Sequence, residues 1–255
     1  MTRVFGADEE GSPRIDPEAV ATFFDSRAER IAELGPTRAV IYQDNHPDLA
    51  ERRDETERQT LLPLLELRPD SRLLDVGCGT GRWVETVAQR VRAYHGVDLT
   101  AGLIDYARKA HTKHTNARFS VASVDGVGLD VIGETEGFDR VLMAGVLIYL
   151  NDDQLERALK ALAGVLEGRT PRVLAREPVA QSERLSIVEH FSEELNSTYN
   201  AIYRTEPELL EAFARAFGPA GLDVIDRGFV FEESSGLNNR PETKQEWFVI
   251  GRRYA

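Results

Sequence analysis

The chain has 255 residues, which is enough for one domain with a full hydrophobic core. It carries 43 acidic and 31 basic side chains, a formal net charge of −12 at pH 7, and this excess argues against a nucleic acid as partner. The single cysteine, Cys78, excludes an internal disulfide framework and a cysteine-rich zinc site. The longest apolar run, Val141–Leu150, is too short to span a bilayer, and no signal-peptide pattern is present. We expect a cytoplasmic protein that binds neither nucleic acid nor membrane.

Residues 1–15 mix Gly, Pro, Ser and acidic residues without periodicity, which predicts a flexible arm. Two helical stretches are expected over residues 16–66. The first begins after Asp16, a good N-cap, and ends at Gly35, and the second begins at Pro47.

From residue 67 onward, short apolar runs alternate with amphipathic helical stretches, which predicts an α/β fold with a largely parallel sheet. Thr100 and Asn151 are good helix N-caps, and Gln154 lies at the capping-box distance from Asn151. The expected strands cover residues 72–76, 93–97, 117–121, 139–143 and 172–175, and the expected helices cover 82–91, a stretch from Thr100 and a stretch from Asn151.

Residues 178–204 interrupt this alternation with aliphatic and aromatic side chains at helix-like intervals, so we expect a helical insert. A capped helix then begins at Thr205. Residues 222–232 and 246–252 form two extended runs with no helix between them, which predicts an antiparallel hairpin.

The stretch Leu73–Gly81, LLDVGCGTG, joins an apolar strand to a helix through a turn with a glycine at every second position. Glycine is needed there because a Cβ would block the approach of a ligand or the positive φ of the turn. Asp98 lies 23 residues beyond Asp75, about one βαβ step, where its carboxylate can accept hydrogen bonds from a ribose diol. The nicotinamide fingerprint G-x-G-x-x-G is not met, since Arg82 occupies the place of its third glycine. A glycine turn with no ligand is the alternative.

This order, D-x-G-x-G-x-G followed by an acid about 20 residues later, resembles the class I S-adenosylmethionine (SAM) dependent methyltransferases. The helical stretches before the first strand and the insert after the fifth resemble the small-molecule enzymes of bacterial natural-product pathways. The resemblance implies a Rossmann-like, seven-stranded, mainly parallel sheet with an antiparallel last strand and helices on both faces. It also implies one domain, in which residues 16–66 are a helical lid and residues 67–255 are the SAM-binding core. Residues 178–204 would be a second part of the lid.

The same resemblance assigns contacts to the cofactor. Asp75 would reach the amino group of SAM, Asp98 would take the ribose hydroxyls, and Leu99 would lie against the adenine. The family usually has an acid beside the adenine amino group, whereas this chain has Ser123 there, so Ser123 with the backbone that follows it and Asp125 are alternatives. The full expected set is Asp75, Gly77, Cys78, Gly79, Asp98, Leu99, Ser123, Val124, Asp125, Ala144 and Arg53.

Two of these residues need a separate argument. Arg53 belongs to the charged stretch ERRDETER, which is most often a solvated helix face; the alternative is that it pairs with the carboxylate of SAM. The backbone of Ala144, at the end of the fourth expected strand, would accept a hydrogen bond from the SAM amino group. No cluster of His, Asp and Glu has metal-ligand spacing on one element, so no metal is expected.

The substrate side is less defined. Ile148 and Tyr149 occupy places where many family members have a histidine pair, and this favours an amine acceptor over an alcohol or phenol, which usually needs a general base. Tyr149 and His190 are the candidate catalytic residues, although a lone histidine on a helix is more often structural. We expect His111 and His114 to be solvated. The candidate substrate contacts, which are equally compatible with ordinary packing, are Phe24, Tyr42, Arg176, Tyr199 and Tyr203.

The expected activity is transfer of the SAM methyl group to an amine or a hydroxyl of a small-molecule metabolite by in-line displacement, which releases S-adenosylhomocysteine (SAH). The alternatives are a protein that keeps SAM as a structural ligand, and an enzyme of the same fold that catalyses another reaction, such as a cyclisation. The expected partner is a small-molecule methyl acceptor, and a homo-oligomer is left open.

Overall fold

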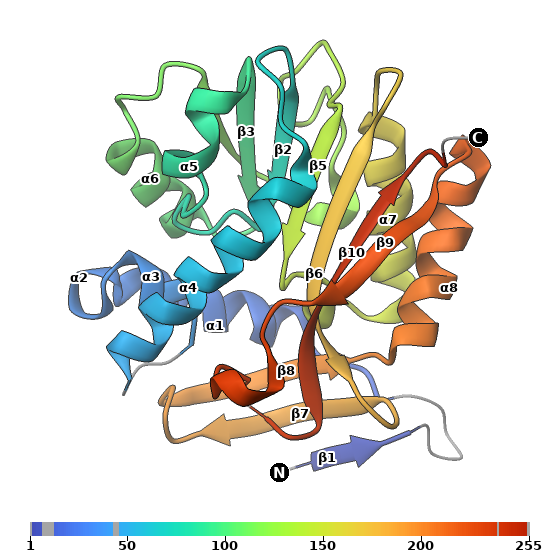
Figure 1. The fold of residues 1–255 in the computed structure, drawn as a ribbon. Coiled ribbons are helices and arrows are strands. Elements are labelled where there is room, and N and C mark those ends of the chain that lie inside the picture. The colour runs from blue at the N-terminus through green and yellow to red at the C-terminus, as the bar shows by residue number, and fades with distance from the viewer. Residues whose placement is uncertain (1, 7–12, 43–45, 239, 254–255) are drawn as a thin grey trace.

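The computed structural model describes residues 2–6, 13–42, 46–238 and 240–253, and their central feature is a seven-stranded sheet (Figure 1). Its strand order is β4-β3-β2-β5-β6-β10-β9. The strands of this sheet are β2 (Arg72–Val76), β3 (Ala93–Asp98), β4 (Ala117–Val121), β5 (Arg140–Ala144), β6 (Arg172–Ala180), β9 (Asp223–Phe229) and β10 (Thr243–Gly251).

The direction of these strands agrees with the expected fold. β2, β3, β4, β5 and β6 pair with one another in parallel. β10 is antiparallel to both β6 and β9, so the last strand runs against the rest of the sheet between its two neighbours. The predicted terminal hairpin and the antiparallel last strand are therefore confirmed.

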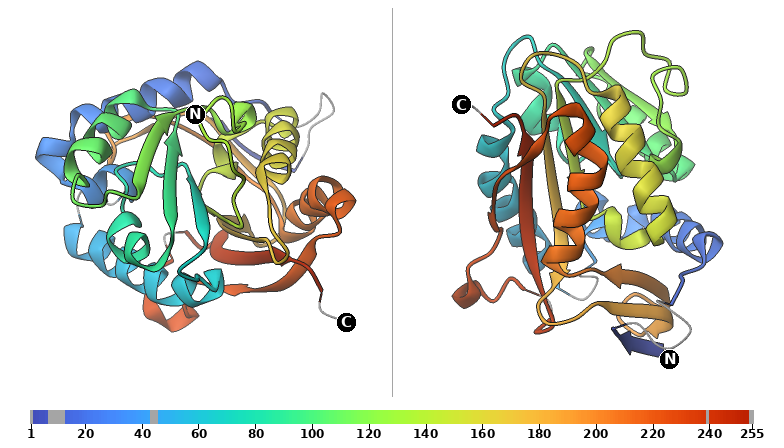
Figure 2. Two further views of the ribbon diagram at one scale, coloured as in Figure 1. Left: turned by 90° about the horizontal axis from the view of Figure 1, so that it is seen from above. Right: turned by 90° about the vertical axis from the view of Figure 1, so that its right-hand side faces the viewer.

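Helices cover both faces of the sheet, as α/β packing requires (Figure 2). Side chains alternate along β2, so Leu73 packs into one hydrophobic cluster and Leu74 into the other. The first cluster includes side chains from α4, α5 and α6, and the second includes side chains from α7 and α8. The helices are α1 (Pro17–Glu29), α2 (Ile31–Leu34), α3 (Pro36–Val40), α4 (Pro47–Leu61), α5 (Val84–Val87), α6 (Ala101–Ala110), α7 (Asp152–Val165) and α8 (Glu206–Phe217).

The predicted helix starts agree with local side-chain chemistry. The side chain of Asp16 accepts a hydrogen bond from the backbone of α1. The backbone N–H of Asn151 donates to Gln154 Oε1 at 3.1 Å, and that of Thr205 donates to Glu208 Oε2 at 2.8 Å, so both expected capping boxes form. The helix expected over residues 82–91 is shorter, because the backbone stays in a turn through Trp83 and tightens into a 3₁₀ turn after α5.

The prediction of a helical insert over residues 178–204 is wrong. β6 continues to Ala180, and β7 (Leu185–Ser192) and β8 (Ser197–Tyr203) follow as an antiparallel pair. The spacing of four between Tyr199 and Tyr203 fits one helical turn, but it equally fits two steps of a strand, in which every second side chain points to the same face. The buried pair Leu185 and Ile187, two residues apart, has the strand period.

The prediction of a flexible arm is also wrong for part of residues 1–15. β1 (Thr2–Phe5) pairs antiparallel with β7 and completes a three-stranded sheet, β1-β7-β8 (Figure 1). Ile15 is buried, and its backbone exchanges two hydrogen bonds with the side-chain amide of Asn151. Residues 1 and 7–12 of the expected arm lie outside the described part of the chain.

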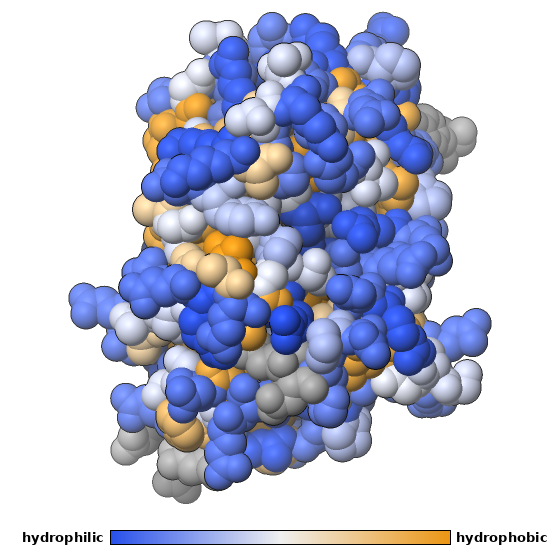
Figure 3. All heavy atoms as spheres, turned by 90° about the vertical axis from the view of Figure 1, so that its left-hand side faces the viewer, coloured by the Kyte–Doolittle hydropathy of each residue, from blue (hydrophilic) through white to orange (hydrophobic). Residues whose placement is uncertain are grey.

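The small sheet and the N-terminal helices lie below the carboxyl ends of the parallel strands (Figure 1). α1 contacts β8 and α6, and Phe23 from α1 packs in one cluster with Leu185, Ile187 and Tyr199. The face shown in Figure 3 is mostly hydrophilic, with small, separate apolar groups. Among the described residues, no helix is both long enough and apolar enough to cross a membrane.

Candidate active site

The glycine turn after β2 has a geometry that only glycine fits. Gly77, Gly79 and Gly81 all have positive φ, at +65°, +55° and +77°. A Cβ on Gly77 would overlap the side chain of Val146, and a Cβ on Gly79 would lie 2.7 Å from Val40 Cγ1. The turn is therefore packed between the loop after β5 and the N-terminal helices, which brings its backbone to the wall of a pocket.

Asp98, the last residue of β3, faces the same turn. One carboxylate oxygen accepts a hydrogen bond from the N–H of Gly79 at 2.9 Å, and the other accepts from the N–H of Thr100 at 2.9 Å. Burial raises the pKa of the Asp98 carboxyl, although these backbone hydrogen bonds oppose the shift. The carboxylate thus fixes the turn and also lines the pocket.

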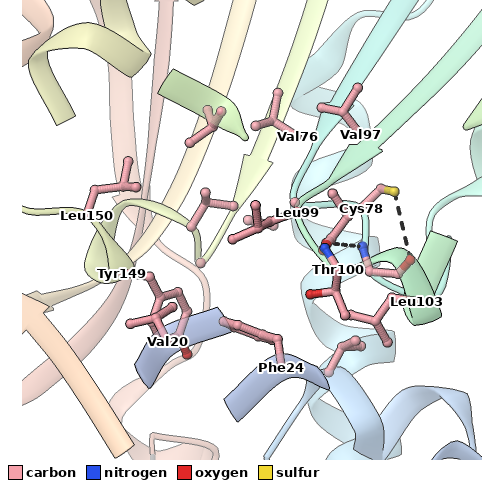
Figure 4. A pocket seen from close by; sticks show the side chains of 18 of the residues that line it. Val20, Phe24, Val76, Cys78, Val97, Leu99, Thr100, Leu103, Tyr149 and Leu150 are labelled. Atoms are coloured by element: carbon pink, nitrogen blue, oxygen red, sulfur yellow. Dashed lines mark hydrogen bonds between the residues drawn. The ribbon is translucent and has the colours of Figure 1, made fainter. Parts of the chain in front are cut away.

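This first pocket lies where β2, β3 and β5 end, with α1 and α3 closing it from below (Figure 4). Phe24 and Val20 from α1 and Tyr149 from the loop after β5 point into it, opposite the strand ends. Seven of the residues expected to contact a cofactor line it: Gly77, Cys78, Gly79, Asp98, Leu99, Val124 and Ala144.

The remaining expected cofactor residues lie elsewhere. Asp75 is 1% exposed behind the turn, where its Oδ2 accepts a hydrogen bond from the Tyr94 hydroxyl. Ser123 and Asp125 bond to each other, and neither lines the pocket. Arg53 lines a neighbouring pocket instead. The placement of these four residues does not match direct contact with a ligand in the first pocket.

The sequence analysis did not predict some of the residues that line the first pocket. Thr100 and Leu103, at the start of α6, line the pocket, and so does Val40 from α3. The position of α6 held a usable signal, because a helix that begins at the carboxyl end of β3 starts at the edge where such sheets bind ligands. The position of α3 depends on tertiary packing and leaves no such local signal.

Residues 73–168, from β2 to just past α7, match the family described as the methyltransferase domain. The chain carries a class I SAM-dependent methyltransferase domain. The turn after β2 and Asp98 both belong to the wall of the first pocket.

Comparisons with individual proteins support the fold assignment but do not identify the substrate. The 23S rRNA (uracil(1939)-C(5))-methyltransferase RlmD of Xanthomonas campestris is 34% identical over 84 residues. That alignment covers 32% of this chain and only 19% of RlmD, so the chain spans about a fifth of the length of the curated relatives it matches.

Two solved structures share the whole architecture. One is the 1,6-didemethyltoxoflavin-N1-methyltransferase of Burkholderia thailandensis, with a TM-score of 0.63 and 17% identity, covering 99% of this chain and 96% of that one. The other is the magnesium protoporphyrin IX methyltransferase of Synechocystis PCC 6803, with a TM-score of 0.62 and 15% identity, covering 95% of this chain and 100% of that one. At these identities the likeness concerns the fold alone.

A second pocket adjoins the first, and the strand β8 and the loop before β10 complete its wall. Four of the five expected substrate residues line it, namely Tyr42, Arg176, Tyr199 and Tyr203, and the fifth, Phe24, lines the first pocket. The residues common to both pockets are Val40, Tyr42, Ala144, Gly145, Tyr149 and Arg176.

Tyrosine hydroxyls form a chain along this wall. The Tyr149 and Tyr199 hydroxyl oxygens are 3.4 Å apart, and those of Tyr199 and Tyr203 are 3.1 Å apart. Burial raises the pKa values of Tyr149 and Tyr203 well above the ordinary value, and it also raises the pKa of Tyr199. These phenols therefore remain protonated and can donate or accept hydrogen bonds, but they are poor general bases at neutral pH.

The two candidate catalytic residues differ in position. Tyr149 lines both pockets. His190 is on β7 opposite Tyr199 in the strand ladder, and it lines neither pocket. The structure therefore does not bring His190 to the site, because the insert is a pair of strands and the expected helix does not form.

Glu177 on β6 holds the loop that separates the two pockets. Its Oε1 accepts hydrogen bonds from the N–H groups of Val146 at 2.9 Å and Leu147 at 3.0 Å. Burial raises the pKa of the Glu177 carboxyl. This buried carboxyl positions the loop that leads to Tyr149, although it lines neither pocket itself.

Within the described chain, two segments bring together one cluster of possible metal ligands, which consists of Glu85 on α5 and of His111 and His114 in the turn after α6. His111 Nδ1 and His114 Nε2 each lie 3.3 Å from a Glu85 carboxylate oxygen, and both histidine side chains are at most 10% exposed, so the prediction of solvated histidines is wrong. The ammonium of Lys113 lies 2.7 Å from Glu85 Oε2 and already balances its charge. The cluster lines neither pocket described above.

Proposed function

We propose that this protein transfers the methyl group of SAM to an amine of a small-molecule metabolite. The observation that supports the proposal is the pair of adjoining pockets, which meet at Ala144 and Gly145 and share Tyr149 and Arg176. In-line displacement needs a nucleophile held opposite the bond between sulfur and methyl, in a space that excludes water. A cofactor in the first pocket and an acceptor in the second would meet that requirement.

An amine is preferred over a hydroxyl because the described lining residues of the second pocket include no side chain that is ready to act as a base. Its tyrosines have pKa values raised by burial. Its carboxyl, Glu57, has a pKa lowered to about 2: burial opposes this shift, but the charges of Arg176 and Arg82 outweigh it. An amine needs only to lose a proton to water near neutral pH, whereas an alcohol needs help. The Burkholderia neighbour is itself named as an N1-methyltransferase.

A ribosomal RNA is the rival acceptor, since curated relatives that match part of this chain are named as 23S rRNA methyltransferases. The net charge of −12 opposes binding to a phosphate backbone. Two further alternatives are SAM binding without turnover and another reaction on the same fold.

An acceptor screen separates these alternatives. The protein is incubated with SAM and, in turn, with primary and secondary amines, phenols and a 23S rRNA fragment, and SAH is measured by mass spectrometry. SAH formed with an amine supports the proposal. SAH formed only with a phenol or with the RNA contradicts it, and tight SAM binding with no SAH in any reaction would identify a binding protein. Consumption of SAM without SAH would indicate a different reaction.

Asp98→Ala should weaken SAH binding by about 30- to 150-fold, since a charge-assisted contact to two ribose hydroxyls contributes on the order of 2–3 kcal/mol. Part of that loss comes from the turn, because Asp98 also accepts from the N–H of Gly79. Asp98→Asn keeps an acceptor oxygen, so its affinity for SAH should lie between the affinities of Asp98→Ala and wild type. Isothermal calorimetry measures the affinities, with Asp105→Ala as control, whose carboxylate is 62% exposed on α6. An unchanged affinity in Asp98→Ala would remove Asp98 from the cofactor site.

A further inference from the structure

The second pocket has an excess of positive charge. The guanidinium groups of Arg53 on α4, Arg176 on β6 and Arg240 before β10 line it, and Glu57 is the one carboxylate among its described lining residues. Buried guanidinium groups are costly unless they are paired with an anion or fully hydrogen-bonded. The partners of each group therefore decide whether this charge is already balanced.

Arg53 has no ion pair and no side-chain hydrogen bond with any residue that the structure describes. It is 7% exposed, and its Nη1 is buried without a partner. One face of the guanidinium lies over the ring of Phe231, 5.2 Å from the ring centre. Burial and the nearby charge of Arg176 lower the pKa of Arg53 to about 10, so it remains a cation at neutral pH. This is a preformed cation with free donors at the pocket wall.

The charge of Glu57 is already shared between two other arginines. Its Oε2 is 2.8 Å from Arg176 Nη2, and its Oε1 accepts from Arg82. Arg176 also donates from Nη1 to Gln245 Oε1 at 3.1 Å, which leaves its buried Nε without a partner.

Arg240, from the loop before β10, is the third arginine of the pocket wall. Its guanidinium carbon lies 5.8 Å from the centre of the Tyr203 ring, and within the described residues it has no ion pair. Three cations from three segments that are far apart in the sequence thus line one pocket. Of these three, only Arg176 pairs with the one carboxylate among the described lining residues, Glu57.

We propose that this pocket binds an anionic group of the methyl acceptor, a carboxylate or a phosphate, between Arg53, Arg176 and Arg240. The inference rests on the proposed function, since it assigns the second pocket to the acceptor. Planar guanidinium groups bind both anions with paired N–H donors. The tyrosine hydroxyls then surround the rest of the acceptor, between the anion and the boundary at Ala144 and Gly145.

The carboxylate of SAM is the other possible source of the same chemistry. Arg53 and Arg240 line the second pocket and not the first, which favours the acceptor. Arg176 lines both pockets, so it alone is positioned to meet either anion.

The test uses calorimetric titration of inorganic phosphate and of benzoate into protein saturated with SAH. Wild type should bind at least one of the two anions saturably, and the stronger of the two identifies the favoured group. Arg53→Gln should weaken that binding at least tenfold and leave SAH affinity within twofold. Arg52→Gln removes the same charge from an exposed neighbour on α4 and should leave both affinities unchanged. Arg240→Gln, at a partly exposed position, should weaken anion binding in the same way. This variant replaces Arg53→Gln in the test if Arg53→Gln does not fold.

The opposite results are distinct. If Arg53→Gln weakens SAH at least tenfold and the anions compete with SAH, the site belongs to the cofactor and the inference is overturned. It is also overturned if neither anion binds saturably, or if Arg52→Gln matches Arg53→Gln. Failure of wild type to bind SAH would sink the proposed function instead; the anion titrations are then run on the free protein and still decide whether the arginine site exists.

Discussion

Glu57→Gln is expected to lower the free energy of unfolding by about 3–5 kcal/mol, because it leaves two buried cations without their shared carboxylate. Glu57 is 4% exposed and lies between Arg82 and Arg176. Arg82 keeps a second partner, Asp54, at 2.7 Å, so the larger penalty falls on Arg176. Urea denaturation at pH 7 measures the loss.

The same variant should also change the pH dependence of stability. Burial opposes ionisation of Glu57, but the charges of Arg176 and Arg82 outweigh it and hold the pKa at about 2, below the ordinary 4.5. A carboxyl with a lowered folded pKa stabilises the fold above its unfolded pKa and loses that contribution as the pH falls. The difference in free energy of unfolding between wild type and Glu57→Gln should therefore be largest above about pH 4.5 and should shrink as the pH falls toward 2.

The exposed Glu55 on the same helix supplies the control for this experiment. Glu55→Gln removes the same charge, and its loss of stability should stay within about 0.5 kcal/mol. A loss below about 1 kcal/mol in Glu57→Gln would mean that water or a rearranged partner compensates the two arginines, and the charge balance described for the second pocket would then be wrong.

The cofactor side of the site was predictable because its signals are local. The strand, the glycine turn and Asp98 lie within one βαβ step, and the requirement for positive φ restricts residue choice at Gly77 and Gly79. Parallel strands then bring their carboxyl ends to one edge whatever the rest of the chain does. Five of the seven predicted residues that line the first pocket belong to this step, and the other two, Val124 and Ala144, lie just after β4 and at the end of β5, where the family resemblance implied contacts.

The small sheet was not predictable from periodicity. Tyr199 and Tyr203 share a face in a helix and in a strand alike, so their spacing does not separate the two. Tyr199 and Tyr203 lie on β8, which pairs with β7, and the other edge of β7 pairs with β1 from the far end of the chain. These pairings, which the spacing does not show, decide between the two. The prediction of a catalytic role for His190 depended on the helical insert, and the helix does not form.

The acceptor side depends on contacts that are remote in sequence. The stretch ERRDETER predicts a solvated face, yet Arg53, Asp54 and Glu57 are buried at helical spacing with Ala50 and Leu61. The period was visible, but the charges argued against burial, and the arginines that compensate them come from the turn after β2 and from β6. Only the folded arrangement reveals that Arg53 has no such partner among the residues that the structure describes.

Asp75→Asn should stabilise the protein at pH 8 and leave it nearly unchanged at pH 4. Burial raises the pKa of the Asp75 carboxyl to about 7, and the hydrogen bond from Tyr94 opposes that shift only in part. An acid with a raised folded pKa takes up a proton on folding, so stability falls as the pH rises from about 4 to 7. A shift of this size corresponds to at most about 4 kcal/mol, and asparagine avoids it because it stays neutral and still accepts from Tyr94.

Urea denaturation of both proteins between pH 4 and 8 tests this expectation, and the quantity of interest is the difference between them at each pH. Asp70→Asn removes a carboxylate that is 82% exposed just before β2 and controls for the loss of net charge. If Asp75→Asn is less stable than wild type by the same amount at every pH, Asp75 keeps one charge state throughout and its carboxylate, rather than its neutral form, supports the turn. A difference that grows with pH in favour of the variant instead identifies Asp75 as a neutral group behind the cofactor pocket, consistent with its place outside the pocket wall.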